Sequence, residues 1–411
     1  MHILFLTQIV PYPPDSGPKV KTWNVLRFLF QQGHRITLVS FVRPEEMQYL
    51  SNLEKLCERI HAVPIRRSRF VDVRYMLRSY LTRRPFLIER DDLHSMQELV
   101  NKLIRNGNFQ VIHADQLTMV QFAIRGAVVS VGKKPGVVFD AHNAVWSIVK
   151  RMQENAPWFL KPILGIEARR VKRYEGGLLK SVDHVLAVTD VDRSGFEEAV
   201  SFSGVSGGEH IAPITVVPIA VDTRQLQPVQ RTPGSKNIVT LGTLHYPPNA
   251  DGIRWFLNEV FPLIRQRVPN VALTIIGKNP PQDFLDFEAR SSGAITVTGY
   301  VPDLVPYLEQ SALMVVPVRA GGGMRVRILE AFAYAMPVVT TTIGLEGIQA
   351  VPGQDVFVAN TAIDFAQRTV ELLEKTSLQE KLSLHGRKLA ESNYDWQITL
   401  RDLVEVYKNF E

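Results

Sequence analysis

Short apolar runs alternate with stretches of helical spacing along the whole chain, and no other feature limits the fold as strongly. Helical patterns such as 22–32 and 93–105 separate the runs. Strands that alternate with helices pair into parallel sheets with helices on both faces, so the sequence predicts an α/β fold. The expected strands cover residues 3–6, 36–41, 111–113, 137–139 and 184–188, and then 238–241, 272–276, 295–298, 313–316, 338–340 and 356–358.

The two sets of runs predict two Rossmann-like, doubly wound parallel-sheet domains, which a chain of 411 residues can hold. We place the N-terminal domain at residues 1–214 and the C-terminal domain at 215–392, with the boundary between Ile214 and Lys236. A last segment, 393–411, has helical spacing.

Composition narrows the class of protein. Hydrophobic residues make up 45% of the chain and charged residues 21%, as in ordinary globular proteins. Cys57 is the only cysteine, which excludes an internal disulfide and a cysteine zinc site and fits a cytoplasmic protein. The sequence has no apolar stretch of the ~18 residues that a membrane span needs. The net charge of +6 comes from the first half of the chain.

A glycine loop between an expected strand and an expected helix is the strongest local signal. Gly321, Gly322 and Gly323 precede Arg325 and Arg327, and Glu330 follows inside the helix. Glycines let backbone amides approach a ligand closely, a helix N-terminus favours anions, and arginines add charged donors. The loop therefore predicts a phosphate or diphosphate site, with a carboxylate placed for sugar hydroxyls. The alternative is a tightly packed turn with solvated arginines.

Other loops lie at the same edge, since ligands of open parallel sheets bind beyond the carboxyl ends of the strands. Gly17 permits close backbone approach in the first loop, where Lys19 and Lys21 add charge. His142 follows another strand and could donate a hydrogen bond to a substrate hydroxyl. Gly242 lets a ligand pass near the backbone in the second domain. The alternative for the loop that contains Gly17 is a rigid proline-rich connector. The alternative for the loop that contains His142 is a capped turn.

The order of several motifs resembles the glycosyltransferases of family 4, which have the GT-B fold. In the C-terminal half the resembling pieces are 241–249, 276–278, 297–303, 316–331 and 336–347. In the N-terminal half they are 13–17, 140–143 and 167–175.

The resemblance implies a transferase that moves a hexose-type sugar from a nucleotide-diphosphate sugar, usually with retention of configuration and without a metal. The nucleotide sugar is then a co-substrate, and no cofactor is expected. The donor is expected on the C-terminal domain, and a polysaccharide or lipid-linked acceptor on the N-terminal one. The segment 393–411 is expected to cross back onto the N-terminal domain.

The resemblance also assigns roles to residues. The family has a pair of glutamates eight positions apart: Glu330 matches the second, which usually binds the ribose, and Gly322 stands where the first would be. Arg325 and Arg327 are expected to neutralise the diphosphate, in the place of basic residues that are missing elsewhere. His142 matches the histidine that contacts the transferred sugar. Tyr300 and Val301 match the segment that meets the base, and Gly17, Gly242 and Gly323 lie in donor-side loops. Lys19, Lys21 and Asn143 are assigned to the acceptor side.

A basic, amphipathic stretch at 66–84 suggests a membrane surface. Apolar residues fall at helical spacing between its arginines, as in peripheral membrane segments. We expect Arg74, Arg78, Arg83 and Arg84 to dock on anionic lipid on the inner face of the plasma membrane. The alternative is a core-facing helix with a solvated basic side. Nucleic acid is not expected, because no binding motif accompanies the charge.

Two further functions remain open on the same fold. One is a nucleotide-sugar epimerase, which would act on the donor alone. The other is a non-catalytic subunit that binds sugar nucleotides, which the glycine at 322 makes plausible.

Overall fold

The computed structural model describes residues 1–204 and 210–410. The chain forms two compact units, which are described separately below. Unit 1 contains Met1–Ile219 and the C-terminal residues from Thr399 onward. Unit 2 contains Ala220–Ile398.

Unit 1 is built on a seven-stranded parallel sheet with the order β3-β2-β1-β4-β5-β6-β7. Its strands are β1 (His2–Thr7), β2 (Arg35–Val42), β3 (Arg59–Pro64), β4 (Val111–Asp115), β5 (Gly136–Asp140), β6 (His184–Ala187) and β7 (Ile214–Val216). Its helices are α1 (Gly17–Gln31), η1 (Pro44–Leu53), α2 (Arg69–Thr82), α3 (Phe86–Asp91), α4 (His94–Asn106), α5 (Leu117–Val128), α6 (Val145–Asn155), α7 (Lys161–Leu178), α8 (Asp190–Phe202) and α17 (Asp402–Lys408).

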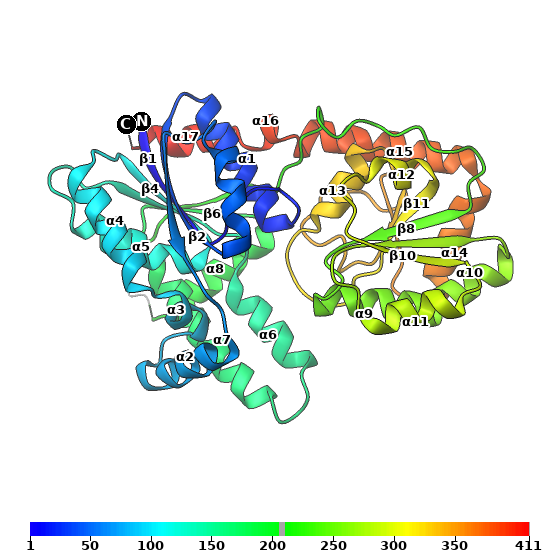
Figure 1. The fold of residues 1–411 in the computed structure, drawn as a ribbon, viewed down its shortest axis with the longest axis horizontal. Coiled ribbons are helices and arrows are strands. Elements are labelled where there is room, and N and C mark those ends of the chain that lie inside the picture. The colour runs from blue at the N-terminus through cyan, green and yellow to red at the C-terminus, as the bar shows by residue number, and fades with distance from the viewer. Residues whose placement is uncertain (205–209, 411) are drawn as a thin grey trace. The chain divides into compact units, whose positions relative to one another are not determined.

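Both faces of this sheet are covered, as Figure 1 shows for α1 on one side and for α4 and α5 on the other. Side chains alternate between the two faces of a strand. In β1, Leu4 and Leu6 therefore join the core formed with α4 and α5. Phe5 points the other way and stacks on His113 of β4, with 4.2 Å between the ring centroids.

Unit 2 is built on a six-stranded parallel sheet with the order β10-β9-β8-β11-β12-β13. Its strands are β8 (Asn237–Leu241), β9 (Ala272–Ile276), β10 (Ile295–Gly299), β11 (Ser311–Val316), β12 (Val338–Thr340) and β13 (Phe357–Val358). Its helices are α9 (Pro247–Trp255), η2 (Phe256–Val260), α10 (Phe261–Arg267), α11 (Gln282–Arg290), α12 (Val305–Glu309), α13 (Val326–Ala333), α14 (Ala362–Glu374), α15 (Thr376–Leu389), η3 (Ala390–Tyr394) and α16 (Trp396–Thr399).

The predicted fold class is confirmed, and every expected strand is present. Two edge strands were not expected. β3 contains Arg59 and His61 among its apolar residues, and β7 has only three residues, so neither forms an apolar run. Because β7 pairs with β6 in the first sheet, unit 1 continues to Ile219, which lies inside the interval from Ile214 to Lys236 that was expected to hold the boundary.

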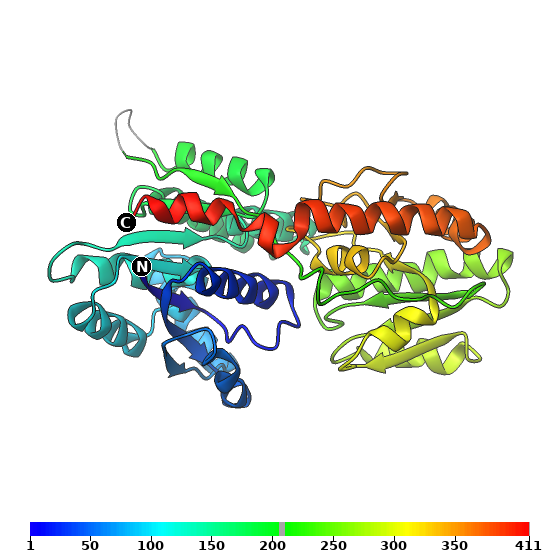
Figure 2. The ribbon, with the colours of Figure 1, turned by 90° about the horizontal axis from the view of Figure 1, so that it is seen from above.

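Of the expected crossing segment 393–411, the part from Thr399 onward belongs to unit 1, whereas residues 393–398 belong to unit 2. Figure 2 shows α17 lying along this unit. Tyr407 is buried, and its hydroxyl lies 2.6 Å from Nδ1 of His113. Burial raises the pKa of Tyr407 well above its usual value, so the hydroxyl stays protonated and donates to Nδ1. Phe410 fills the space beside Gly136, where any Cβ atom would collide with its ring.

The Tyr407 hydroxyl gives a test of how firmly this segment is attached. We expect Tyr407→Phe to lower the free energy of unfolding of unit 1 by about 1–3 kcal/mol, because Nδ1 of His113 would be left buried without a donor. Urea unfolding followed by tryptophan fluorescence measures the loss. Lys408→Ala is the control, since Lys408 forms only an exposed ion pair with Glu405. Equal effects of the two substitutions would contradict this role for Tyr407.

Candidate active site

The glycine loop of unit 2 connects β11 to α13 and is held in shape by its own arginine. Gly321 and Gly323 have φ angles of 97° and 82°, a left-handed conformation that side chains disfavour. Arg325 is the N-cap residue of α13, and its Nη1 donates to the carbonyl oxygens of Gly322 and Gly323 at 2.6 and 2.8 Å. The loop is therefore a rigid turn whose arginine lies against its backbone.

Arg327 joins this loop to the neighbouring strand. Its Nη1 donates to the carbonyl oxygen of Leu241, at the end of β8, at 2.6 Å, and its Nη2 donates to Oδ1 of Asn249 in α9. A Cβ atom at position 242 would collide with Nη1 of Arg327, so the close approach requires Gly242. The structure thus brings Gly242, Arg325 and Arg327 to one edge of the sheet, as the sequence predicted. Their partners here are protein groups.

Two side chains at this edge, Arg327 and Glu330, have shifted pKa values. Burial, and then the nearby Arg325, lowers the pKa of Arg327 to about 10, so the guanidinium remains charged at neutral pH. Burial raises the pKa of Glu330 to about 7, although the charge of Arg327 acts in the opposite direction. The N-terminal turn of α13 therefore carries cationic groups beside a carboxyl that changes its charge near neutral pH, which suits an anionic ligand with hydroxyl groups.

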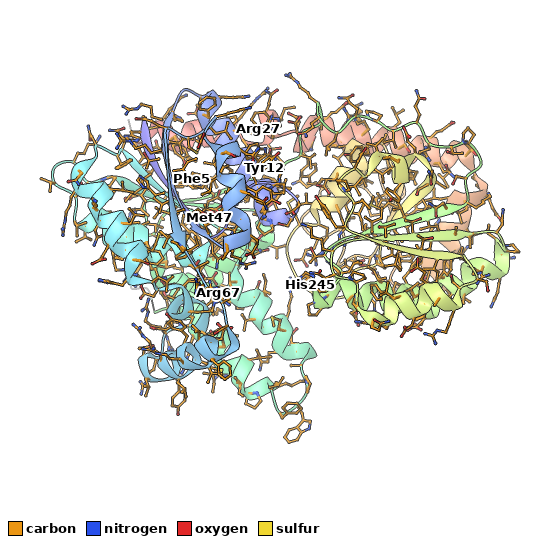
Figure 3. All side chains as sticks on the ribbon, viewed as in Figure 1. Phe5, Tyr12, Arg27, Met47, Arg67 and His245 are labelled. Carbon is orange, nitrogen blue, oxygen red and sulfur yellow. The ribbon has the colours of Figure 1, made fainter. Side chains whose placement is uncertain are left out.

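The remaining loops of the same edge are more open. Tyr300 follows β10 and is 55% exposed, with Nζ of Lys278 4.4 Å from its ring centroid. Val301, next to it, is half-buried. His245 is exposed in the loop before α9 (Figure 3). The exposed ring of Tyr300 offers a surface on which the aromatic base of a nucleotide could stack.

In unit 1, Asp115 at the end of β4 organises the histidine that the sequence singled out. Its carboxylate accepts hydrogen bonds from Thr7 at 2.7 Å and from Thr22 at 3.0 Å. Nε2 of His142 lies 2.7 Å from the same carboxylate and donates to it. Nδ1 of His142 is buried and has no hydrogen-bond partner in the described residues. One nitrogen is thus fixed by the protein, and the other is left for a further partner.

The assignment of Lys21 to the acceptor side is wrong. Lys21 lies in α1 with its side chain only 2% exposed, and Nζ forms an ion pair with Asp140 and donates to the carbonyl oxygen of Ala141 at 3.1 Å. Burial alone would raise the pKa of Asp140, but Lys21 and His113 outweigh it and hold that pKa well below its usual range. The sequence could not show that this lysine points into the core.

The other predicted residues of unit 1 lie near the same strand ends. Gly17 begins α1, and Asn143 is half-buried after β5. Nζ of Lys19 lies 3.7 Å from Asp15 and 3.9 Å from Glu46, so its charge is partly balanced.

One buried cluster could in principle hold a metal. His113, Asp115 and Asp140 bring ligand atoms within 4.8 Å of one another. Lys21 already pairs with Asp140, and the Tyr407 hydroxyl already occupies His113. Protein groups therefore already engage two members of the cluster, while Nε2 of His113 and Oδ2 of Asp140 lie 3.4 Å apart and have no hydrogen-bond partner in the described residues.

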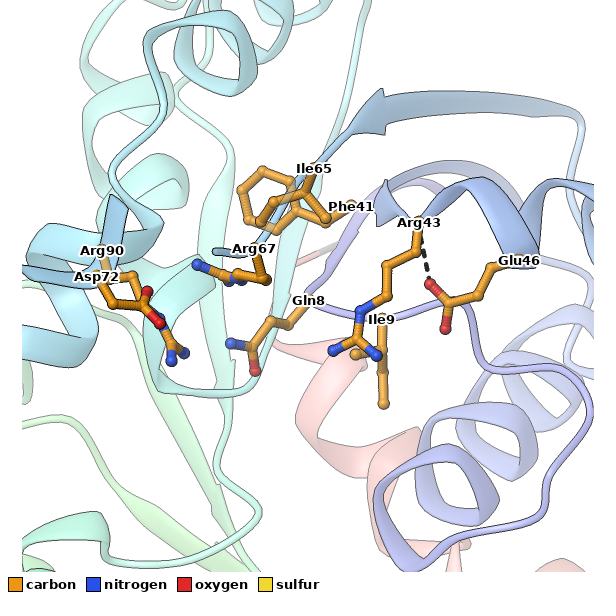
Figure 4. Close-up of a pocket in the computed structure, with 9 residues that line it drawn as sticks. All are labelled: Gln8, Ile9, Phe41, Arg43, Glu46, Ile65, Arg67, Asp72 and Arg90. Carbon is orange, nitrogen blue, oxygen red and sulfur yellow. Dashed lines mark hydrogen bonds between the residues drawn. The ribbon is translucent and has the colours of Figure 1, made fainter. Parts of the chain in front are cut away.

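A polar pocket that the sequence did not reveal opens at the carboxyl ends of β1, β2 and β3 (Figure 4). It has a volume of about 270 Å³. Two of its arginines, Arg67 and Arg90, bond to Asp91 at 2.6 and 3.2 Å. It was missed because β3 was not expected, so the start of the basic stretch 66–84 was not placed at a strand end. Its lining residues are Gln8, Ile9, Phe41, Arg43, Glu46, Ile65, Arg67, Asp72 and Arg90.

The basic stretch forms α2, and its apolar side chains face outward. Phe70 is 90% exposed, and Val73, Leu77 and Leu81 are exposed as well. A core-facing helix, the alternative for this stretch, is therefore wrong. The four arginines also differ from one another. Arg74 and Arg83 are exposed, whereas Arg78 and Arg84 form ion pairs with Glu89 at 2.8 and 3.0 Å, so the latter two are less available to lipid than predicted. No helix in the described parts of the chain is long and apolar enough to span a bilayer.

Comparisons with a family model and with curated proteins each match part of the chain. A family model described as "Glycosyl transferases group 1" matches residues 235–375. An uncharacterized 44.6 kDa protein in the cps region of Klebsiella pneumoniae is 26% identical over 166 residues. CapM, a capsular polysaccharide biosynthesis glycosyltransferase of Staphylococcus aureus, is 26% identical over 162 residues. The matches cover 39% and 38% of this chain and 42% of each relative, so the chain spans less than half the length of the curated relatives it matches.

Comparison with solved structures covers the whole chain. HepE from Anabaena in complex with UDP-glucose has a TM-score of 0.67 at 14% identity, with full coverage of both chains at 100%. Sucrose-phosphate synthase from Thermosynechococcus elongatus has a TM-score of 0.70 at 14% identity, covering 100% of this chain and 99% of that one. TarM has a TM-score of 0.68 at 10% identity, covering 100% and 98%. Each unit thus has the parallel-sheet α/β architecture of GT-B glycosyltransferase structures, and residues 235–375 match the family of group 1 glycosyl transferases.

Proposed function

We propose that the protein is a glycosyltransferase that moves a hexose-type sugar from a nucleotide-diphosphate sugar to a polysaccharide or lipid-linked acceptor. The observation that carries the proposal is the convergence of Arg325, Arg327 and Glu330 at the N-terminal turn of α13, beside Gly242. The family model over 235–375 supports it, as does the likeness of the fold to a structure that holds UDP-glucose.

The chemistry of the donor fits these residues. When the bond between the anomeric carbon and the phosphate oxygen breaks, the diphosphate takes the electron pair and gains negative charge. Arg325 and Arg327 would stabilise this charge together with backbone amides of the glycine loop, without a metal ion. Glu330 would accept hydrogen bonds from the ribose hydroxyls. The acceptor hydroxyl forms the new bond to the anomeric carbon, and its proton passes to the departing diphosphate oxygen. We propose that the configuration is retained.

His142 would contact the transferred sugar. The Asp115 carboxylate holds Nε2 as a donor, which leaves Nδ1 for a sugar hydroxyl. Asp115 acts here as a positioning residue, because it fixes the orientation of the ring.

The acceptor side suggests a membrane. The outward apolar side chains of α2, together with Arg74 and Arg83, fit peripheral docking on anionic lipid. We therefore propose a cytoplasmic enzyme that works at the inner face of the plasma membrane on a lipid-linked or glycan acceptor.

The donor site is tested by thermal stabilisation with a panel of UDP-, GDP-, dTDP- and ADP-sugars. We expect one nucleotide to raise the melting temperature, because a ligand that binds only the folded state stabilises it. Glu330→Gln should weaken this ligand about tenfold or more, since charge-assisted hydrogen bonds contribute about 1.5–3 kcal/mol. Glu374→Gln, an exposed position on α14, should have no effect.

Product analysis with the donor alone separates the alternatives. An altered sugar nucleotide without acceptor would indicate an epimerase. Binding without turnover over a broad acceptor panel would indicate a non-catalytic subunit. A chain that no nucleotide sugar stabilises would contradict the proposed donor site.

The raised pKa of Glu330 predicts a pH dependence of binding. The carboxyl group can accept two ribose hydrogen bonds only when it is ionised, and it ionises as the pH rises through about 7. Affinity for the nucleotide sugar should therefore increase up to about tenfold from about pH 6 to about pH 8. A nucleotide sugar is the right probe, because its diphosphate has no terminal phosphate that titrates in this range. Calorimetry should show a flat profile for Glu330→Gln, and an equal slope in both proteins would refute this role.

Asp115 provides a test on unit 1. Asp115→Asn should lower kcat about ten- to hundredfold, because the His142 ring would lose its fixed orientation. Stabilisation by the nucleotide sugar, which reports on unit 2, should be unchanged. Thr22→Ala removes one of the neighbouring donors to Asp115 and serves as the control for packing. If the two variants lose equal activity, the effect is structural and the positioning role fails.

A further inference from the structure

A second pocket of unit 1 is ringed by arginines and is not used by the proposed reaction. It lies between the end of α2, the start of α3 and the C-terminal half of α7, and has a volume of about 320 Å³. Arginine side chains come to it from two separate parts of the chain. The lining residues are Arg83, Arg84, Pro85, Arg170, Arg173, Tyr174, Gly177 and Leu178.

The positive charge of this pocket is mostly unbalanced. Arg84 is engaged, since its Nη1 lies 3.0 Å from Glu89 and 2.9 Å from Asp92. Within the described residues, neither Arg83, Arg170 nor Arg173 has a carboxylate oxygen within 4.0 Å, the limit of an ion pair. The pocket can therefore accept an anion without displacing an internal partner.

The carboxylate of Glu167 interacts electrostatically with Arg170, but it already has a hydrogen-bond partner. Glu167, one turn earlier in α7, accepts a hydrogen bond from the backbone N–H of Phe86 at 2.7 Å. Its carboxylate ties α7 to α3 and so helps to hold the two sides of the pocket together. Planar guanidinium groups offer paired donors that match the oxygens of a phosphate.

The surroundings of the pocket are apolar and exposed. Tyr80 and Leu81 precede Arg83 at the end of α2, and both are exposed. Ile163 and Ile166 precede Arg170 in α7 and are exposed as well. Trp158, in the turn between α6 and α7, is 83% exposed. Both helices that supply the arginines therefore also carry apolar side chains at the surface.

We propose that this pocket binds the phosphate group of a membrane phospholipid while the apolar side chains of α2 and of the α6–α7 turn enter the lipid surface. A free phosphate would not require the exposed apolar residues on both sides, whereas a lipid carries a phosphate and a hydrocarbon part together. The inference rests on the membrane docking proposed above, to which it adds a defined headgroup site.

The test is flotation of the full-length protein with vesicles of phosphatidylcholine, with and without phosphatidic acid. The double variant R170S/R173S removes two arginines of the pocket. Its matched control, R105S/R169S, removes the same charge from exposed positions that do not line the pocket, one of them on α7 itself. R170K/R173K keeps the charge and loses the planar fork. Unfolding midpoints confirm that each variant is folded.

We expect R170S/R173S to weaken binding to phosphatidic acid vesicles about tenfold or more, given the attraction that each basic residue contributes near a membrane. The control should lose less than about threefold, and R170K/R173K should fall in between. Equal losses in R170S/R173S and the control would overturn the pocket but leave membrane docking in place. If the unchanged protein does not float with either vesicle, docking itself fails. Stabilisation by inorganic phosphate that is lost in R170S/R173S, without vesicle binding, would overturn the lipid assignment.

Discussion

Arg327 holds two neighbouring strand ends of unit 2 together, and much of the candidate donor site depends on that contact. Its guanidinium reaches from α13 to the last carbonyl of β8 and to Asn249 at the start of α9. This explains why position 242 has no side chain. The Arg327 guanidinium occupies the space that a side chain at position 242 would otherwise fill. A ligand that bonds to it would find its donors already in position, which lowers the entropic cost of binding.

In unit 1 the charged groups at the strand ends are buried and interact with one another. Its strand ends carry a buried chain of polar groups that runs from Lys21 through Asp140 and His113 to Tyr407. Charges that are removed from water need partners of matching geometry, so such a chain tolerates few alternative packings. It joins α1, two central strands and α17 in a single arrangement. His142 lies beside this network, paired with Asp115, and its Nδ1 has no hydrogen-bond partner in the described residues.

The parts of the fold that follow from burial could be read from the sequence. Central strands are covered on both faces and appear as apolar runs, and the glycine loop follows one of them. Edge strands such as β3 are covered less completely and look like loops, so the polar pocket beyond β3 was missed. Lys21 and Lys19 are two residues apart in one helix, and only the packing of α1 shows that the first is buried. The sequence also could not show that the apolar side chains of α2 point outward, because an amphipathic pattern does not indicate which side of a helix packs against the core.

The path of the chain between the two units has a consequence for synthesis. Unit 2 is one continuous stretch, Ala220–Ile398, whereas unit 1 is interrupted by it and is completed by residues from Thr399 onward. Domains fold as units while the chain emerges from the ribosome. Unit 2 can therefore close before translation ends. Unit 1 has to wait, with the space beside Gly136 unfilled and His113 lacking its tyrosine, until the residues from Thr399 onward have been made. The first part of the chain therefore stays incomplete throughout the synthesis of unit 2, and α17 completes its packing only afterwards.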